Sequence, residues 1–332
     1  MTDLIPPFDF HRVIVVPWTD GFTSFGWVAL MGFFVASSCG LIGNYLILRR
    51  MSLVGDAISH SILPGIAIAF LLANSRSTTA MFIGALSAGV LTTVIIELIH
   101  KKSRVKQDAA IGIAFTTLFA IGVILISLYA DKVDLDQECV LYGEIAFVGP
   151  FIHGMVDIGG IPIAPLPVFR MGCVAIVTAV LVFLFYKELL VSSFDPGLAA
   201  SLGINAGVMH YALMAMLSVV VVSAFESVGA ILVIAMLILP GATATLISQR
   251  LPAVLLLSVL HAALSSVVGV HLGLWLQCSV AAAMVVAGTV FFVLAWFLSP
   301  RSGLIARWTR PLAPIRPLEL QPGPIRESAR AN

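Results

Sequence analysis

The stretch RRMSLVGDAISHSILPGIAIAFLL, residues 49–72, begins with a basic pair and continues as an apolar segment long enough to cross a bilayer. Within it, Asp56 and His60 are four residues apart, so a helix presents both side chains on one face. A carboxylate with an imidazole suits a borderline transition-metal ion such as Zn²⁺, Mn²⁺ or Fe²⁺. Pro64 lacks an N–H group, so the carbonyl of His60 loses its helical partner and needs another at membrane depth.

Two structural roles stay open for this pair. Asp56 suits the cap of the helix that starts here, and His60 suits a hydrogen bond to a neighbouring helix. Ionisable residues inside a membrane span are costly, so a functional role is the default hypothesis for both. We therefore predict that Asp56 and His60 contact a metal ion.

The composition is that of a membrane protein. Hydrophobic residues make up 60% of the chain, charged residues 11%, and the mean hydropathy is +1.07, whereas soluble domains carry about 25% charged residues. The net charge of +1 argues against a nucleic-acid partner. The four cysteines form no C-x-x-C pair, so neither a disulfide framework nor a zinc knuckle is indicated.

Apolar segments of about twenty residues predict an all-α polytopic fold. The nine expected spans lie near residues 25–48, 53–72, 79–99, 109–129, 170–187, 207–226, 229–248, 253–273 and 278–298. Only a turn around Ser227–Gly229 joins two of them, and a re-entrant or extracellular helix there reduces the total to eight. The fold prediction is therefore eight or nine transmembrane helices.

The basic residues predict the orientation. With the N-terminus outside, 14 of the 18 Lys and Arg residues fall in inner connections or in the C-terminal tail. The outer segments keep Arg12, Arg76, Lys132 and Arg170. The excess of inner basic residues favours an outer N-terminus and a cytoplasmic C-terminus. We expect an extracytoplasmic segment at 1–24, a transmembrane domain at 25–298 and a disordered cytoplasmic tail at 299–332.

Other polar residues give weaker signals. The outer loop 130–169 is rich in Asp and Glu, which fits either a mouth that attracts cations or an ordinary solvated loop. Glu226, near the outer end of its span, fits a gate that contacts the cation or a simple interfacial carboxylate. His210, His261 and His271 are each alone in their stretch, so we expect structural roles for them.

The inner connection KELLVSSFDPGLAASLGINAG, residues 187–207, contains a short helix with clear boundaries. Asp195 and Pro196 suit an N-cap and a first helical position, and Gly203 suits a C-terminal stop. The apolar residues near this helix are Phe194, Leu198 and Leu202. A short capped helix of this kind docks either into its own bundle or into a groove of a partner.

Four ordered motifs together resemble the permease subunits of bacterial ABC transporters for zinc, manganese and iron. They are RRMSLVGDAISHSILPGIAIAFLL, QDAAIGIAFTTLFAIGVILIS, SSFDPGLAASLGI and VGAILVIAMLILPGATA. The resemblance covers roughly residues 25–298, and VDLDQECVLYGEIAFV points to the manganese/iron branch. The tail beyond Pro300 is outside it.

The resemblance implies a multi-pass protein of the bacterial plasma (inner) membrane. Such permeases pair with a second, identical or related permease subunit, receive the ion from an extracytoplasmic metal-binding protein and depend on a separate cytoplasmic ATPase. Asp56 and His60 match the metal contacts of the path, and no cofactor is bound permanently. The residues that match the ATPase-coupling segment are Phe194, Asp195, Pro196, Leu198, Ala199, Leu202 and Gly203.

Competing functions are less consistent with the sequence. The chain has no G-x-x-x-x-G-K-[ST] loop, so it is not expected to be an enzyme that hydrolyses ATP. An intramembrane metalloenzyme needs a ligand set such as H-E-x-x-H, which does not occur. A secondary, ion-coupled metal carrier is the alternative, although such carriers often show repeated halves and we find no convincing repeat.

Overall fold

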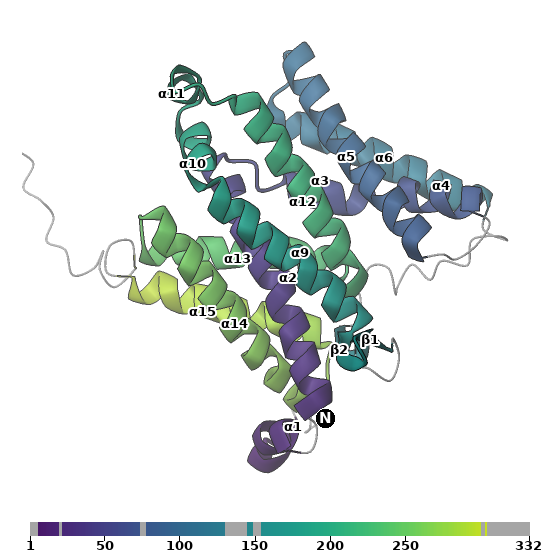
Figure 1. The fold of residues 1–332 in the computed structure, drawn as a ribbon, viewed down its shortest axis with the longest axis vertical. Coiled ribbons are helices and arrows are strands. Elements are labelled where there is room, and N and C mark those ends of the chain that lie inside the picture. The colour runs from purple at the N-terminus through teal and green to yellow at the C-terminus, as the bar shows by residue number, and fades with distance from the viewer. Residues whose placement is uncertain are drawn as a thin grey trace, which may run out of the picture.

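The computed structural model describes residues 6–19, 22–73, 78–129, 145–148, 154–299 and 303, and most of them are helical (Figure 1). The helices are η1 (His11–Val15), α1 (Val16–Thr19), α2 (Phe22–Leu48), α3 (Val54–Ser61), α4 (Leu63–Ala73), α5 (Thr78–Lys102), α6 (Gln107–Leu128), η2 (Ile145–Phe147), α9 (Leu166–Leu184), α10 (Tyr186–Phe194), α11 (Pro196–Ser201), α12 (Ala206–Val228), α13 (Ala230–Ile247), α14 (Leu251–Leu276) and α15 (Val280–Leu298). Two short strands, β1 (Met155–Ile158) and β2 (Ile161–Pro165), form a hairpin.

The prediction of an all-α polytopic membrane protein is confirmed. Within the described residues, eight helical segments are long and apolar enough to cross a bilayer, and Val233–Ile247 is a shorter apolar helix. Gly229, with a φ of 79°, separates α12 from α13, so the turn falls where the sequence placed it. One of the eight segments, Val54–Ala73, was expected to be a single helix but consists of α3 and α4.

The helices form three groups. α2, α9 and α12 lie between α4–α6 on one side and α13–α15 on the other (Figure 1). α3 packs against α5, α6, α12 and α13 and so connects the groups. α1 and the β1–β2 hairpin lie at one end of the molecule, and α10 and α11 lie at the opposite end (Figure 1). The short helix 196–201 is therefore far from the N-terminal segment.

The β1–β2 hairpin was not predicted. It lies in the loop assigned to residues 130–169, where Gly159 and Gly160 have positive φ angles of 66° and 85° and join Ile158 to its partner Ile161. A Gly-Gly pair is a recognised signal for a two-residue hairpin turn, so the sequence did contain the information. Residues 130–144 and 149–153, with most of the acidic positions, and the tail 304–332 lie outside the described residues.

Small and polar residues bring α2 close to its neighbours. A Cβ atom added at Gly43 would lie 1.8 Å from the carbonyl oxygen of Leu237 in α13. The side-chain amide of Asn44 donates a hydrogen bond of 2.9 Å to the hydroxyl of Ser258 in α14. Small residues that allow backbones to approach, together with interhelical hydrogen bonds, are the main attractions between helices in lipid. α2 therefore depends on Gly43 for its packing against α13.

The substitution Gly43→Ala tests this packing. The added methyl group has no space beside Leu237, so we expect the substitution to destabilise the fold by about 1–3 kcal/mol, as overpacking does. The thermal unfolding midpoint of the purified protein in detergent measures the change. Gly112→Ala is the control, because a Cβ at Gly112 meets nothing within 4 Å. An unfolding midpoint that is unchanged in both variants contradicts the assigned contact.

Candidate cation site and coupling segment

α3 presents its only two titratable residues on its only accessible face. Its other six residues, Val54, Gly55, Ala57, Ile58, Ser59 and Ser61, are buried. The side chains of Asp56 and His60 are 33% and 27% exposed. The spacing of four residues thus places both groups toward the same open side of the helix. In a short helix that is otherwise buried, this is the arrangement expected of a ligand face.

The two side chains are close enough to bind one ion together. Nε2 of His60 lies 3.3 Å from Oδ1 of Asp56. Two ligands that are each about 2.1 Å from one metal ion are this far apart when the angle between them is about 105°, close to tetrahedral. The His60 ring also lies beside Phe115 and Phe119 of α6, with ring centroids 6.0 Å and 5.9 Å away. These aromatic rings restrict where the imidazole can turn.

The capping role for Asp56 is wrong. The N-cap of α3 is Leu53, and no side chain caps this end. Asp56 is in the first turn, where the helix dipole favours a negative charge. Among the described residues, the imidazole of His60 makes its polar side-chain contact with Asp56. The pair therefore lies together on α3, as the sequence spacing requires.

The end of α3 is fixed by close backbone packing. α3 stops at Ser61, and Pro64 follows within the first turn of α4. A Cβ at Gly65 would lie 2.2 Å from the carbonyl oxygen of Gly84 in α5, and a Cβ at Gly122 in α6 would lie 2.9 Å from the ring of Pro64. The interruption that follows Asp56 and His60 is thus held between α5 and α6.

Glu226 is the residue for which the sequence left a gate contact and an interfacial carboxylate open. The residue belongs to α12, three residues before Gly229, but its side chain is not among those described. Of the residues that are described, no three or more His, Cys, Asp or Glu side chains gather in a group able to hold a metal ion. Within one chain, the described residues of α3 therefore offer two candidate ligands, Asp56 and His60.

The segment 194–203 contains the short helix α11. Oδ1 of Asp195 accepts hydrogen bonds from the backbone N–H groups of Gly197 (2.9 Å) and Leu198 (3.0 Å) and so caps the helix. At the other end Gly203 has a φ of 78°, and the amide of Ile204 bonds to the carbonyl of Ala199. Phe194, at the end of the preceding helix, Leu198 and Leu202 are exposed, whereas Ala199 is buried.

Sequence reasoning missed a helix and a polar cluster. α10, Tyr186–Phe194, precedes α11 and is joined to it by Asp195 alone. His210, which looked isolated in the sequence, lies 3.2 Å from Glu97 of α5 and beside Arg49. Glu97, an ionisable residue in an apolar helix with Lys101 four residues later, was the available signal.

The other two histidines lie apart from the cation face. His261 is buried in α14, where its ring meets that of Phe291 with centroids 5.9 Å apart. His271 accepts a hydrogen bond of 3.0 Å from the indole of Trp18, and its other nitrogen bonds to the carbonyl of Val13. His271 thus fastens the N-terminal helices to the end of α14.

Comparisons with known proteins identify the family. Residues 22–299 match the ABC 3 transport family. The chain is 45% identical to the manganese transport system membrane protein MntD of Bacillus subtilis, over 86% of this chain and 96% of that protein. It is 40% identical to the zinc transport system membrane protein TroD of Treponema pallidum, over 84% of this chain and 75% of that protein.

A solved structure has the same fold. The structure of PsaBC from Streptococcus pneumoniae in complex with a Fab contains a chain that superposes with a TM-score of 0.73 and 32% sequence identity. The match covers 90% of this chain and all of that one. Sequence and fold therefore agree, and this protein belongs to the ABC 3 transport family.

Proposed function

We propose that this chain is the membrane subunit of an ATP-driven importer that moves divalent transition-metal ions, manganese, iron or zinc, into the cytoplasm. Membership of the ABC 3 transport family supports the proposal, as do relatives named for manganese and zinc transport. The observation that carries it is the accessible face of α3, where Asp56 and His60 lie 3.3 Å apart on an otherwise buried helix. A carboxylate and an imidazole are suitable ligands for each of these ions.

Two ligands make a transient site rather than a permanent one. An ion in transit must be held well enough to enter and weakly enough to leave. Water, or a second permease subunit placed across the path, completes the coordination. The exposed fractions of Asp56 and His60, 33% and 27% in the single chain, are consistent with a face that meets such a partner. This second subunit is either a copy of the chain or a related permease.

The proposed orientation has the N-terminus outside and the C-terminus in the cytoplasm. An extracytoplasmic metal-binding protein delivers the ion at the end where α1 and the β1–β2 hairpin lie, and Glu226 is proposed as a further cation contact near that end. α11 then lies at the cytoplasmic end (Figure 1). Leu198 of α11 (50% exposed), with Phe194 (68%) and Leu202 (61%) on either side of the helix in sequence, forms an apolar surface for a separate ATPase subunit.

Substitution of the ligand pair tests the cation site. In Asp56→Ala and His60→Ala, we expect ATP-dependent uptake of Mn²⁺ into proteoliposomes to fall at least about tenfold, because each variant loses a charge-assisted contact worth roughly 1.5–3 kcal/mol. The assay uses the permease with its ATPase subunit and radioactive Mn²⁺, with Fe²⁺ and Zn²⁺ as competitors.

His100→Ala is the matched control, because His100 is exposed at the end of α5 and should leave uptake unchanged. Normal uptake in both ligand variants removes Asp56 and His60 from the path. Uptake that a proton or sodium gradient drives without the ATPase indicates a secondary carrier instead.

A charge placed on α11 tests the ATPase surface. Leu198→Asp should weaken binding of the ATPase subunit at least about tenfold, because burial of a leucine contributes roughly 1.5–3 kcal/mol. Ala200→Asp introduces the same charge on the same helix at another exposed position, two residues from Leu198 and therefore on a different face, and should bind normally. Binding of the purified ATPase subunit to the immobilised permease measures both. Equal binding of the Leu198 variant and the unmodified chain contradicts the proposed surface.

A further inference from the structure

Arg49 lies where the cytoplasmic helices meet the helix that carries the cation face. Its Nε atom donates a hydrogen bond of 2.9 Å to the hydroxyl of Ser193, and its Nη2 atom donates one of 3.0 Å to the hydroxyl of Ser192. Both serines are in α10. The third contact, from Nη1, reaches Nδ1 of His210 in α12 at 3.3 Å. Burial lowers the pKa of Arg49, and the three side-chain contacts replace part of the water that this burial removes.

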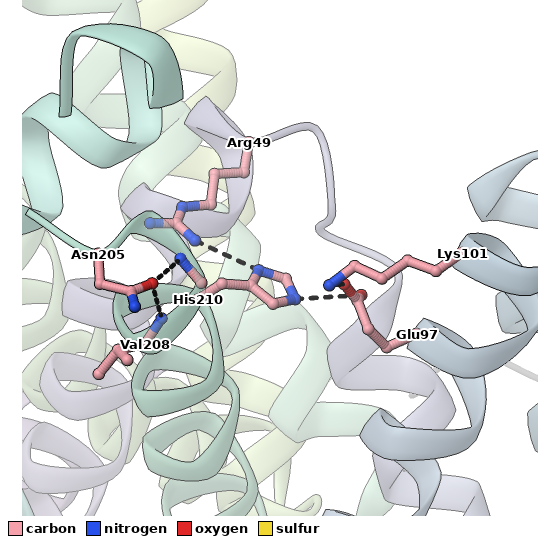
Figure 2. A network of polar contacts seen from close by, with 7 residues as sticks. Arg49, Glu97, Lys101, Asn205, Val208 and His210 are labelled. Carbon is pink, nitrogen blue, oxygen red and sulfur yellow. Dashed lines mark hydrogen bonds and ion pairs between the residues drawn. The ribbon is translucent and has the colours of Figure 1, made fainter. Parts of the chain in front are cut away.

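The geometry determines which nitrogen of His210 carries the proton. A guanidinium can only donate, so Nδ1 of His210 must accept. The proton is then on Nε2, which donates to Oε2 of Glu97 at 3.2 Å. The other carboxylate oxygen of Glu97 is 2.6 Å from Nζ of Lys101. Figure 2 shows Arg49, His210, Glu97 and Lys101 in a row from α2 to α5.

Two connections next to Arg49 are short. Asp195 follows Ser193 by two residues. It is both the C-cap of α10 and the N-cap of α11. At the end of α2, the amides of Arg50 and Met51 bond back to Ile47 and Leu46, and the amide of Val54 bonds to Met51 as α3 begins. If α10 and α11 shift, the hydrogen bonds to Ser192 and Ser193 pull on Arg49 directly. A shift of Arg49 in turn moves the start of α3, because only one tight turn separates them.

The row is not a second metal site. Glu97 and His210 are metal-ligand types, but Arg49 and Lys101 already contact them. A divalent ion between Glu97 and His210 would face two fixed positive charges, and both nitrogens of the imidazole are already engaged. The cluster instead joins α10, the end of α2, α12 and α5 by hydrogen bonds and an ion pair.

We propose that Arg49 is a positioning residue that transmits movement of α10–α11 to α3, through Ser192 and Ser193 on one side and His210 and Glu97 on the other. The inference rests on the proposed function, in which an ATPase subunit moves α11 and the face of α3 contacts the ion. Without Arg49, α11 still docks, but its movement no longer repositions Asp56 and His60.

The test separates docking from coupling. In proteoliposomes that contain the permease and its ATPase subunit, Arg49→Gln should still bind the ATPase and hydrolyse ATP. The number of Mn²⁺ ions taken up per ATP should fall at least about fivefold, the lower end of usual coupling factors. The double variant Ser192→Ala, Ser193→Ala removes only the acceptors on α10 and should lower the same ratio.

Arg50→Gln is the control, since Arg50 is the exposed neighbour with the same charge, and should keep the unmodified ratio. An unmodified ratio of ions to ATP in Arg49→Gln overturns the proposal. If that variant does not fold, an unmodified ratio in the double serine variant overturns it.

A second measurement distinguishes this inference from the proposed function. If the unmodified complex takes up no divalent ion, the proposed function fails. Amide hydrogen exchange of the permease alone then tests whether Arg49 links α10–α11 to α3. Arg49→Gln should accelerate exchange in both 186–204 and 54–61. Acceleration in one segment only, or in neither, shows that Arg49 does not join them.

Discussion

A backbone carbonyl inside a bilayer has no water to bond with, and Pro64 removes the amide that would serve the carbonyl of His60. We attribute the interruption between α3 and α4 to this proline. Close contacts at Gly65 and Gly122 hold the interruption against α5 and α6. The rest of the candidate site depends on this constraint, because it makes α3 a short separate helix that ends one residue after His60.

A helix of eight residues has little stability of its own, so its neighbours decide its position. α3 is held at its end by the packing around Pro64 and at its start by the tight turn that follows Arg49. The proposed cation face therefore lies between two fixed points, one in the membrane-spanning helices and one next to α10. In the proposed mechanism, a small movement of either point changes the direction in which Asp56 and His60 face.

The sequence predicted the helices and the shared face of Asp56 and His60 because apolar length and a four-residue spacing are local properties. The cap of α11 by Asp195 is local too. The polar row was missed because Arg49, Glu97 and His210 come from three distant segments, and only packing brings them together. The hydrogen bond lost at Pro64 was expected from the sequence, but the helix boundary at Ile62 was missed because the span 53–72 was delimited by hydropathy alone.

The central claim is that the accessible face of α3 contacts the transported ion. The most direct test is an experimental structure of the complex with Mn²⁺, with data collected at the manganese absorption edge. We predict an anomalous peak within bonding distance of Oδ1 of Asp56 and Nε2 of His60. A manganese peak elsewhere along the path, with these two side chains in contact with lipid or sealed between helices, would contradict the account.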